Sequence, residues 1–217
     1  MKKEKYLTLE NCKEKTAFWY KLLEGLRGTK VQLPLKISGN AGLIVIDLQK
    51  YFTEPQSHAF VPSIDVVIYN ITRLVEQFKK RIYTRHIDLP DTSMCKWWGD
   101  GLFENDDFSH IDERVKPSGT VIVKHTYSAF KDTELEKLLR EKNVERVYIS
   151  GVLTNLCCET TARDAFNHGF EVFFIADATA TYTEEFHVAT LRNLAHGFAR
   201  IVTTDTVLEW RACGYDL

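Results

Sequence analysis

The stretch RVYISGVLTNLCCETTARDAFNHG, from Arg146 to Gly169, places a short apolar strand directly before a helix. Its first six residues, RVYISG, are rich in β-branched and apolar side chains, as expected for a strand that is buried on both faces. The residues from Thr154 to His168 are predicted to form a helix that stops at Gly169. A strand that passes into a helix within a few residues is the repeating unit of a parallel α/β fold.

The same unit recurs on both sides of this stretch. Five further strands are predicted, at Gly42–Asp47, Arg81–His86, Thr120–Lys124, Glu171–Ala176 and Ala199–Thr203. Helical periodicity between them predicts helices at Ser63–Lys80, Glu134–Lys142 and Thr183–Gly197. The predicted fold class is therefore α/β, a three-layer (αβα) Rossmann-like fold with a six-stranded, mostly parallel sheet.

Two segments stand outside this alternation. Residues 1–40 form a predicted N-terminal helical extension, with an amphipathic helix that starts at Thr8 and ends near Gly25 or Gly28. Such a helix covers its own domain or packs on a symmetry mate. The segment from Ile87 to Gly119 has no convincing periodicity but is rich in aromatic residues, which favours an ordered lid or subunit contact.

The bulk composition limits the partners. A chain of 217 residues with 44% hydrophobic residues is long enough for one sizeable core, and its formal net charge of -2 comes from mixed acids and bases. We therefore expect a small-molecule substrate, no nucleic acid and no membrane. No apolar run reaches the ~20 residues that span a bilayer, and the Lys-rich start is not followed by a signal-peptide core, so we expect a cytoplasmic protein. The five scattered cysteines predict reduced thiols and no structural zinc site.

Ligands of parallel sheets bind at the carboxyl ends of the strands. That edge is predicted to carry an acid, a base and a thiol among the residues Asp47, Arg85, His86, Lys124, His125 and Cys157. Each has an ordinary alternative: a turn-capping acid, a solvated lysine, a small core cysteine. A cysteine in the first turn of a helix is expected to have its thiolate stabilised, but geometry does not choose between Cys157 and Cys158.

Three blocks of the chain resemble the motifs of the isochorismatase-like cysteine hydrolases. They are LIVIDLQKYF (Leu43–Phe52), VIVKHTYSAF (Val121–Phe130) and GVLTNLCCETTARDAF (Gly151–Phe166), and the similarity runs from about Leu43 to Thr204. The third block is the most specific, because eight positions fall in the family's register: Thr154, Asn155, Cys157, Thr161, Ala162, Arg163, Asp164 and Ala165. The resemblance assigns residues 41–217 to a hydrolase domain of this family, whose members are commonly dimers or tetramers. It thus implies a homodimer or homotetramer.

The resemblance also implies an active site. In its register Asp47, Lys124 and Cys157 form the catalytic triad, with Asp47 as general base, and Cys158 is a packing residue. The backbone N–H groups of Leu153 and Cys157 would form the oxyanion hole, with a cis peptide bond before Leu153.

The substrate contacts are open to more than one interpretation. Arg85, His86 and His125 could meet a substrate carboxylate or be solvated rim residues. Trp98 and Phe130, with Trp97, could line an apolar pocket or pack on their own domain or on a neighbouring subunit.

The predicted chemistry is hydrolysis of an amide, carbamoyl or ureido C–N bond in a small molecule, through a thioester on Cys157. One alternative is hydrolysis of the vinyl ether of isochorismate, which needs an acid but no thiol. A second is a non-catalytic interaction protein on the same fold. No cofactor and no metal are expected, because the Asp and His spacing of the family's metal-dependent nicotinamidases is absent, although His58 and His86 remain possible ligands.

Overall fold

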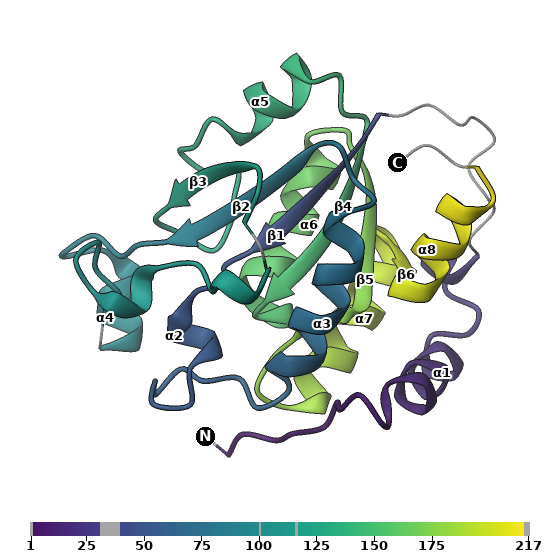
Figure 1. Cartoon of the computed structure of the whole chain (residues 1–217), viewed down its shortest axis with the longest axis horizontal. Coiled ribbons are helices and arrows are strands. Elements are labelled where there is room, and N and C mark those ends of the chain that lie inside the picture. The colour runs from purple at the N-terminus through teal and green to yellow at the C-terminus, as the bar shows by residue number, and fades with distance from the viewer. Residues whose placement is uncertain (1, 31–39, 100, 116, 215–217) are drawn as a thin grey trace.

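The computed structural model describes residues 2–30, 40–99, 101–115 and 117–214 (Figure 1). Its strands are β1 (Ala41–Ile46), β2 (Arg81–His86), β3 (Thr120–Lys124), β4 (Arg146–Val152), β5 (Glu171–Ala180) and β6 (Arg200–Val202). They form one sheet in the order β3-β2-β1-β4-β5-β6, and all the strand pairings are parallel. The predicted α/β fold class is confirmed.

The strand order reverses between β1 and β4. From β1 the chain moves outward through β2 to β3, and then it returns to place β4 on the other side of β1. Ligand sites of open parallel sheets form at such a reversal, beyond the carboxyl ends of the strands. Asp47 follows β1 directly, and Cys157 follows β4 by five residues.

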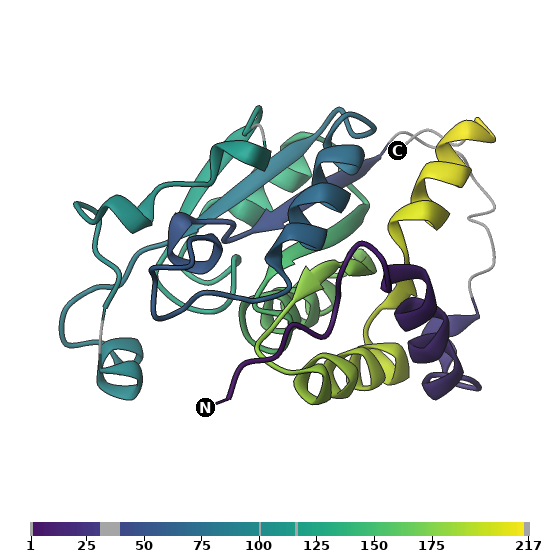
Figure 2. The ribbon, with the colours of Figure 1, turned by 60° about the horizontal axis from the view of Figure 1, so that its bottom comes forward.

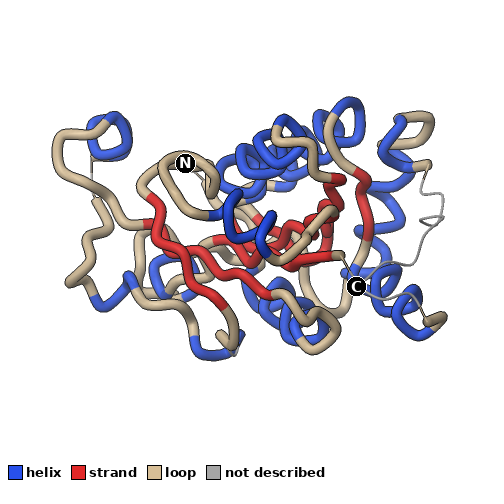
Figure 3. Tube along the Cα trace, turned by 90° about the horizontal axis from the view of Figure 1, so that it is seen from above, coloured by secondary structure: helices blue, strands red, loops and turns tan. Residues whose placement is uncertain are grey.

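Helices cover both faces of the sheet (Figure 3). The helices are α1 (Cys12–Leu22), α2 (Lys50–Thr53), α3 (Ile64–Val75), α4 (Ser93–Trp98), α5 (Leu135–Glu141), α6 (Glu159–Asn167), α7 (Glu184–Gly197) and α8 (Thr204–Ala212). Apolar side chains of α5, α6 and α7 pack on one face of the sheet, whereas those of α3 and α8 pack on the other. β1 is buried along its whole length, which explains its unbroken apolar run.

Several predicted boundaries differ from the structure. β5 continues four residues beyond the predicted Ala176, because its small residues remain buried beside β4 after a register shift. The predicted helix from Thr154 begins as a π-helical turn, Thr154–Cys158, and becomes α-helical only at Glu159. Helix α8 was not predicted, although Thr203 caps it by accepting the N–H of Thr206.

The N-terminal extension packs on its own domain. Tyr6, Leu7, Trp19 and Leu23 are buried in the same apolar cluster as α6 and α7. Figure 2 shows the purple N-terminal segment running beside α7. Residues 31–39, which join the extension to β1, lie outside the described residues, and the predicted division at residue 40 stays a prediction. So does self-association, for which Phe18, 49% exposed, remains available on α1.

The long segment between β2 and β3 is ordered where it is described. It holds α4 and two short 3-10 turns, Asp107–Ser109 and Glu113–Val115, and it buries Leu102 and Val115. Within the described ranges, no helix is both long and apolar enough to cross a bilayer.

Candidate active site

An acid, an amine and a thiol meet at the carboxyl edge of the sheet. The Lys124 Nζ lies 2.7 Å from Asp47 Oδ2, and it donates to Cys157 Sγ at 3.4 Å. Asp47 and Lys124 are fully buried, and Cys157 is 6% exposed. The structure thus brings together three residues that the sequence separates by up to 110 positions.

Asp47 is held by a neighbouring strand. Its backbone leaves β1 with a left-handed φ of 48°, and Thr84 of β2 holds it at two points. The Thr84 hydroxyl donates to Asp47 Oδ1 at 2.5 Å and accepts the Asp47 N–H at 3.1 Å. One carboxylate oxygen therefore faces Thr84 and the other faces Lys124. Thr84 was missed at the sequence level; its only signal is its alternation with His86 on one face of β2.

Lys124 has a third partner besides the acid and the thiol. Its ammonium also donates to the carbonyl of Thr126 at 2.9 Å, so three groups surround it. Burial alone would lower the pKa of Lys124, but the charges and hydrogen bonds of Asp47 and Cys157 outweigh it and raise that pKa. Lys124 is therefore a permanent cation between the other two groups.

The turn that carries Cys157 depends on a close approach of backbones. Gly151 of β4 has a φ of 113°, and a Cβ there would lie 2.1 Å from the carbonyl oxygen of Ile46 in β1. Only glycine permits this approach. The next peptide bond but one, Val152–Leu153, is cis, as the resemblance implied. Cys158, the neighbour of Cys157, is fully buried in the apolar core.

The thiol of Cys157 is not activated at rest. Burial, together with the carboxylate of Asp47, raises its pKa to about 12, and the charge of Lys124 only partly opposes them. The burial of the sulfur, which lies in a π-helical turn, opposes the stabilisation of the thiolate that a helix N-terminus is expected to give. The hydrogen bond between Cys157 and Asp47 instead places the thiol proton beside a carboxylate.

The predicted substrate contacts His86 and His125 lie at the carboxyl ends of β2 and β3. Their rings bond to the segment that follows β2. His86 Nε2 lies 2.9 Å from Asp88 Oδ1, and the other oxygen of Asp88 accepts the N–H of Leu102 at 2.8 Å. His125 Nδ1 donates to the carbonyl of Ile87 at 2.7 Å. Both histidines thus tie the segment after β2 to the sheet edge.

Asp88 is a second acid that the sequence analysis missed. Burial alone would raise its pKa, but hydrogen bonds from His86 and Leu102 and the charge of Lys124 outweigh it, so the pKa is lowered. The effect of Lys124 shows that the Asp88 carboxylate lies within electrostatic reach of the triad. Its sequence signal is the spacing of two residues from His86, just beyond the end of β2.

Trp98 reaches towards the triad through a tyrosine. Its indole N–H donates to the hydroxyl of Tyr127 at 2.8 Å, while the side chain stays 48% exposed. The pKa of Tyr127 is raised by burial and further by the neighbouring Cys157. Helix α4 is therefore linked to Tyr127, which is an additional candidate contact.

Two predicted substrate contacts are placed elsewhere. Arg85 alternates with Thr84 and His86, so its side chain leaves the other face of β2. There it bonds to Ser109 and forms an ion pair with Glu104 at 3.1 Å. Phe130 lies in the packed core, with its ring stacked on His168 at 4.9 Å. The structure does not bring either side chain to the triad.

The residues considered as metal ligands do not fit a metal. His86 Nε2 and both oxygens of Asp88 are used by the contacts described above, and His58 is exposed with its Nε2 2.8 Å from the Tyr51 hydroxyl. Among the residues that the structure describes, no group of three or more His, Cys, Asp or Glu side chains could hold a metal ion. We derive no catalytic step through a metal.

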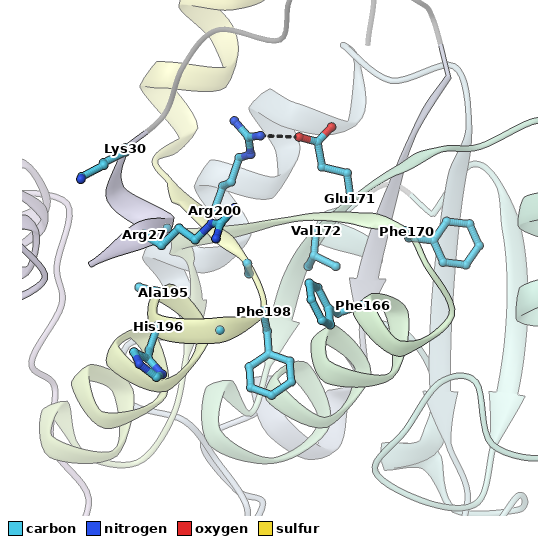
Figure 4. Close-up of a pocket in the computed structure, with 13 residues that line it drawn as sticks. Arg27, Lys30, Phe166, Phe170, Glu171, Val172, Ala195, His196, Phe198 and Arg200 are labelled. Atoms are coloured by element: carbon cyan, nitrogen blue, oxygen red, sulfur yellow. Dashed lines mark ion pairs between the residues drawn. The ribbon is translucent and has the colours of Figure 1, made fainter. Parts of the chain in front are cut away.

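A cavity of roughly 670 Å³ lies where β5 and β6 begin (Figure 4). Arg27, Arg200 and the rings of Phe166 and Phe198 line it, and Arg200 pairs with Glu171 at 2.9 Å. No member of the triad lines this cavity. Although the cavity is large, it opens at the amino ends of the strands, whereas the converging polar groups lie at their carboxyl ends.

Comparisons with known proteins show the family of the chain. A family profile described as the isochorismatase domain matches residues 41–206. Nicotinamidase 3 of Arabidopsis thaliana is 39% identical over 76% of this chain and 85% of its own length. Enterobactin synthase component B of Escherichia coli (strain K12) is 32% identical over 77% of this chain and 62% of its own.

A solved structure shares both fold and sequence with the chain. The crystal structure of a cysteine hydrolase from Pseudomonas syringae pv. phaseolicola 1448A superimposes with a TM-score of 0.79 at 27% identity. The match covers 85% of this chain and 98% of that one. With the family profile spanning most of its length and the fold shared, the chain belongs to the isochorismatase family of hydrolases.

Proposed function

We propose that the protein is a cysteine amidohydrolase that cleaves an amide, carbamoyl or ureido C–N bond of a small molecule. The observation that carries the proposal is the buried contact chain from Asp47 through Lys124 to Cys157, at 2.7 and 3.4 Å. A nucleophile beside a base that is itself oriented by a third group is the arrangement that covalent catalysis requires. The similarity to a protein named nicotinamidase, at 39% identity, supports an amide substrate.

The first half of the reaction forms a thioester. The thiol proton of Cys157 moves to Asp47 as Sγ bonds to the substrate carbonyl carbon, which gives a tetrahedral oxyanion. The C–N bond then breaks, and the proton passes from Asp47 to the departing nitrogen. Because Cys157 has a pKa of about 12, this proton transfer accompanies attack and does not precede it. Lys124 keeps its charge throughout and stabilises both anionic partners.

The second half regenerates the thiol. Asp47 accepts a proton from a water molecule while the water oxygen attacks the thioester carbon. The C–S bond then breaks, and the proton returns from Asp47 to the sulfur of Cys157. The products are a carboxylic or carbamic acid and ammonia or an amine. In both halves the oxyanion would be bound by the backbone N–H groups of Leu153 and Cys157, which flank the turn.

The substrate pocket would be lined by residues at and beyond the ends of β2 and β3. Trp98 and Tyr127 supply aromatic surface and a hydroxyl on one side, while the His86–Asp88 pair supplies polar groups at the end of β2. Such a mixture suits a small planar amide with one polar substituent. Arg85 and Phe130 take no part, because their side chains are engaged elsewhere.

A panel of small amides, ureas and isochorismate tests the proposal, with ammonia and pyruvate as the measured products. The unsubstituted protein should release ammonia from at least one compound, and Cys157→Ala should lower that rate by about 10³-fold or more. Cys158→Ala is the matched control, because Cys158 packs in the core and should leave the triad in place. Pyruvate release from isochorismate that survives Cys157→Ala would instead favour the vinyl-ether hydrolase.

A further inference from the structure

We propose that the N-terminal extension positions the Cys157 turn, acting through Tyr6, Trp19 and His187, so that it forms part of the catalytic apparatus. This inference rests on the proposed function for its kinetic consequences. The extension precedes the matched family region, which begins at residue 41. Its rings nevertheless lie in the same apolar cluster as Cys157 and Cys158.

The first connection runs along the backbone after β5. The N–H of Glu4 donates to the carbonyl of Tyr182 at 2.8 Å, and the hydroxyl of Tyr6 accepts the N–H of Thr181 at 3.1 Å. The hydroxyl of Thr181 in turn donates to Asn155 Oδ1 at 2.6 Å. The start of the chain is thus bonded to Thr181, and Thr181 is bonded to Asn155, two positions before Cys157.

The second connection runs through α7. The indole N–H of Trp19 donates to Glu184 Oε1 at 2.8 Å, and Lys15 forms an ion pair with Glu184 Oε2 at 2.6 Å. These contacts fix α1 to the first turn of α7. One turn further along α7, the ring of His187 lies 4.4 Å from that of Trp19 and 5.6 Å from that of Tyr6. His187 is fully enclosed by these neighbours.

His187 passes this restraint to the catalytic turn. Its Nδ1 lies 3.0 Å from the hydroxyl of Thr154, the first residue of the π-helical turn. Burial lowers the pKa of His187 to about 3, so the ring stays neutral at every working pH. The contact is therefore a hydrogen bond between neutral groups, with no part in proton transfer. Its effect is to orient Thr154.

The hydrogen bonds to Thr154 and Asn155 support a π-helical turn. Turns of this kind are rare, and they occur frequently at functional sites. Thr154 and Asn155, which open the turn, each bond to a residue that contacts the extension. Since a displacement of about 1 Å at a reacting atom can cost roughly 100-fold in rate, loss of this support should appear in turnover.

The test compares Trp19→Ala with Phe18→Ala in the full chain. Trp19 is 1% exposed and contacts His187, whereas its neighbour Phe18 is 49% exposed. On an amide that the unsubstituted protein hydrolyses, Trp19→Ala should lower kcat about tenfold or more, with KM within about twofold. Phe18→Ala should change neither value. Trp19→Phe, which keeps a ring against His187, should restore most of kcat.

Hydrogen exchange followed by mass spectrometry supplies a readout that needs no substrate. In Trp19→Ala the amides of residues 154–158 should exchange at least about fivefold faster, while those of β3 keep their rate. Thr154→Val, which removes only the last hydrogen bond, should give the same local change and the same loss of kcat. Should Trp19→Ala not fold, Tyr6→Phe, which loses a single hydroxyl, replaces it in the comparison.

Two results would overturn the proposal. One is an unchanged kcat in Trp19→Ala and Thr154→Val, and the other is faster exchange spread equally over β3 and the turn. If the unsubstituted protein hydrolyses none of the amides, the proposed function fails. The exchange comparison still decides whether the extension holds the turn.

Discussion

Replacing Lys124 by methionine should destabilise the protein strongly, because it leaves the Asp47 carboxylate buried without its cation. The two groups are fully buried and 2.7 Å apart, which corresponds to about 6 kcal/mol of Coulomb attraction at an effective dielectric constant of about 20. Burying the Lys124 ammonium removes its hydration, and the variant avoids this cost, which offsets part of the lost attraction. Removal of one partner from a buried ion pair costs about 3–5 kcal/mol in other proteins, and we expect that loss here.

The loss would consume much of the stability of a typical domain, which is about 5–15 kcal/mol. At about 2–4 °C per kcal/mol for a chain of this size, Tm should fall by roughly 6–20 °C. Urea unfolding followed by circular dichroism measures the free energy of unfolding directly. Lys137→Met is the matched control, since Lys137 pairs with Glu134 on an exposed helix surface and should leave the free energy of unfolding nearly unchanged.

The double variant Asp47→Asn, Lys124→Met separates stability from catalysis. With no charge left in the site, it should be more stable than Lys124→Met by about 2 kcal/mol or more, while Thr84 still bonds to residue 47. It should nevertheless release no ammonia from any amide, because the base and the cation are both gone. The electrostatic reasoning is refuted if Lys124→Met unfolds like the unsubstituted protein, or if the double variant is no more stable than Lys124→Met.

Three further outcomes are expected. Because the pKa of Cys157 is about 12, its alkylation by iodoacetamide should accelerate about tenfold per pH unit from pH 7 to 10. A plateau near neutrality would contradict this. Burial raises the pKa of Asp177 from 3.8 to about 6, so the folded state binds the Asp177 proton more tightly than the unfolded state does. The free energy of unfolding should therefore fall by about 3 kcal/mol as the pH rises from 4 to 6. Asp177→Asn should abolish this fall, which unfolding measured across that pH range would show. Gly151→Ala should prevent folding or lower the free energy of unfolding in urea by more than about 3 kcal/mol. Gly197→Ala, where an added Cβ meets open space, should be tolerated. Equal stabilities of the two variants would count against the close approach of β4 to β1.

The architecture could be predicted because hydrophobic periodicity is a local property. The apolar run from Gly42 to Asp47 and the five similar runs predict strands that are buried on both faces. Strands that alternate with helices leave few possible topologies. The errors in the fold fall where packing overrides local pattern. The small residues at the end of β5 resemble a loop but stay in the sheet, because β4 lies beside them after its register shift.

The candidate site was only partly predictable. Asp47, Lys124 and Cys157 stand at strand ends, and the family resemblance selected them. Their partners were not visible, because Thr84 and Asp88 become meaningful only when β2 lies beside β1 and the following segment folds back. Arg85 could not be placed from the sequence, and alternation along β2 turns it to the opposite face from Thr84.

The sequence by itself determined the alternating α/β order and the strand ends that carry the acid, the amine and the thiol. Those features depend on residue type and spacing along the chain. Tertiary structure alone decided that the Cys157 thiol is protonated at rest and that its turn is reached by Tyr6 and Trp19 from the other end of the chain. The physical reason is that a pKa and a packing contact depend on burial and on neighbours distant in sequence, which only the folded chain brings together.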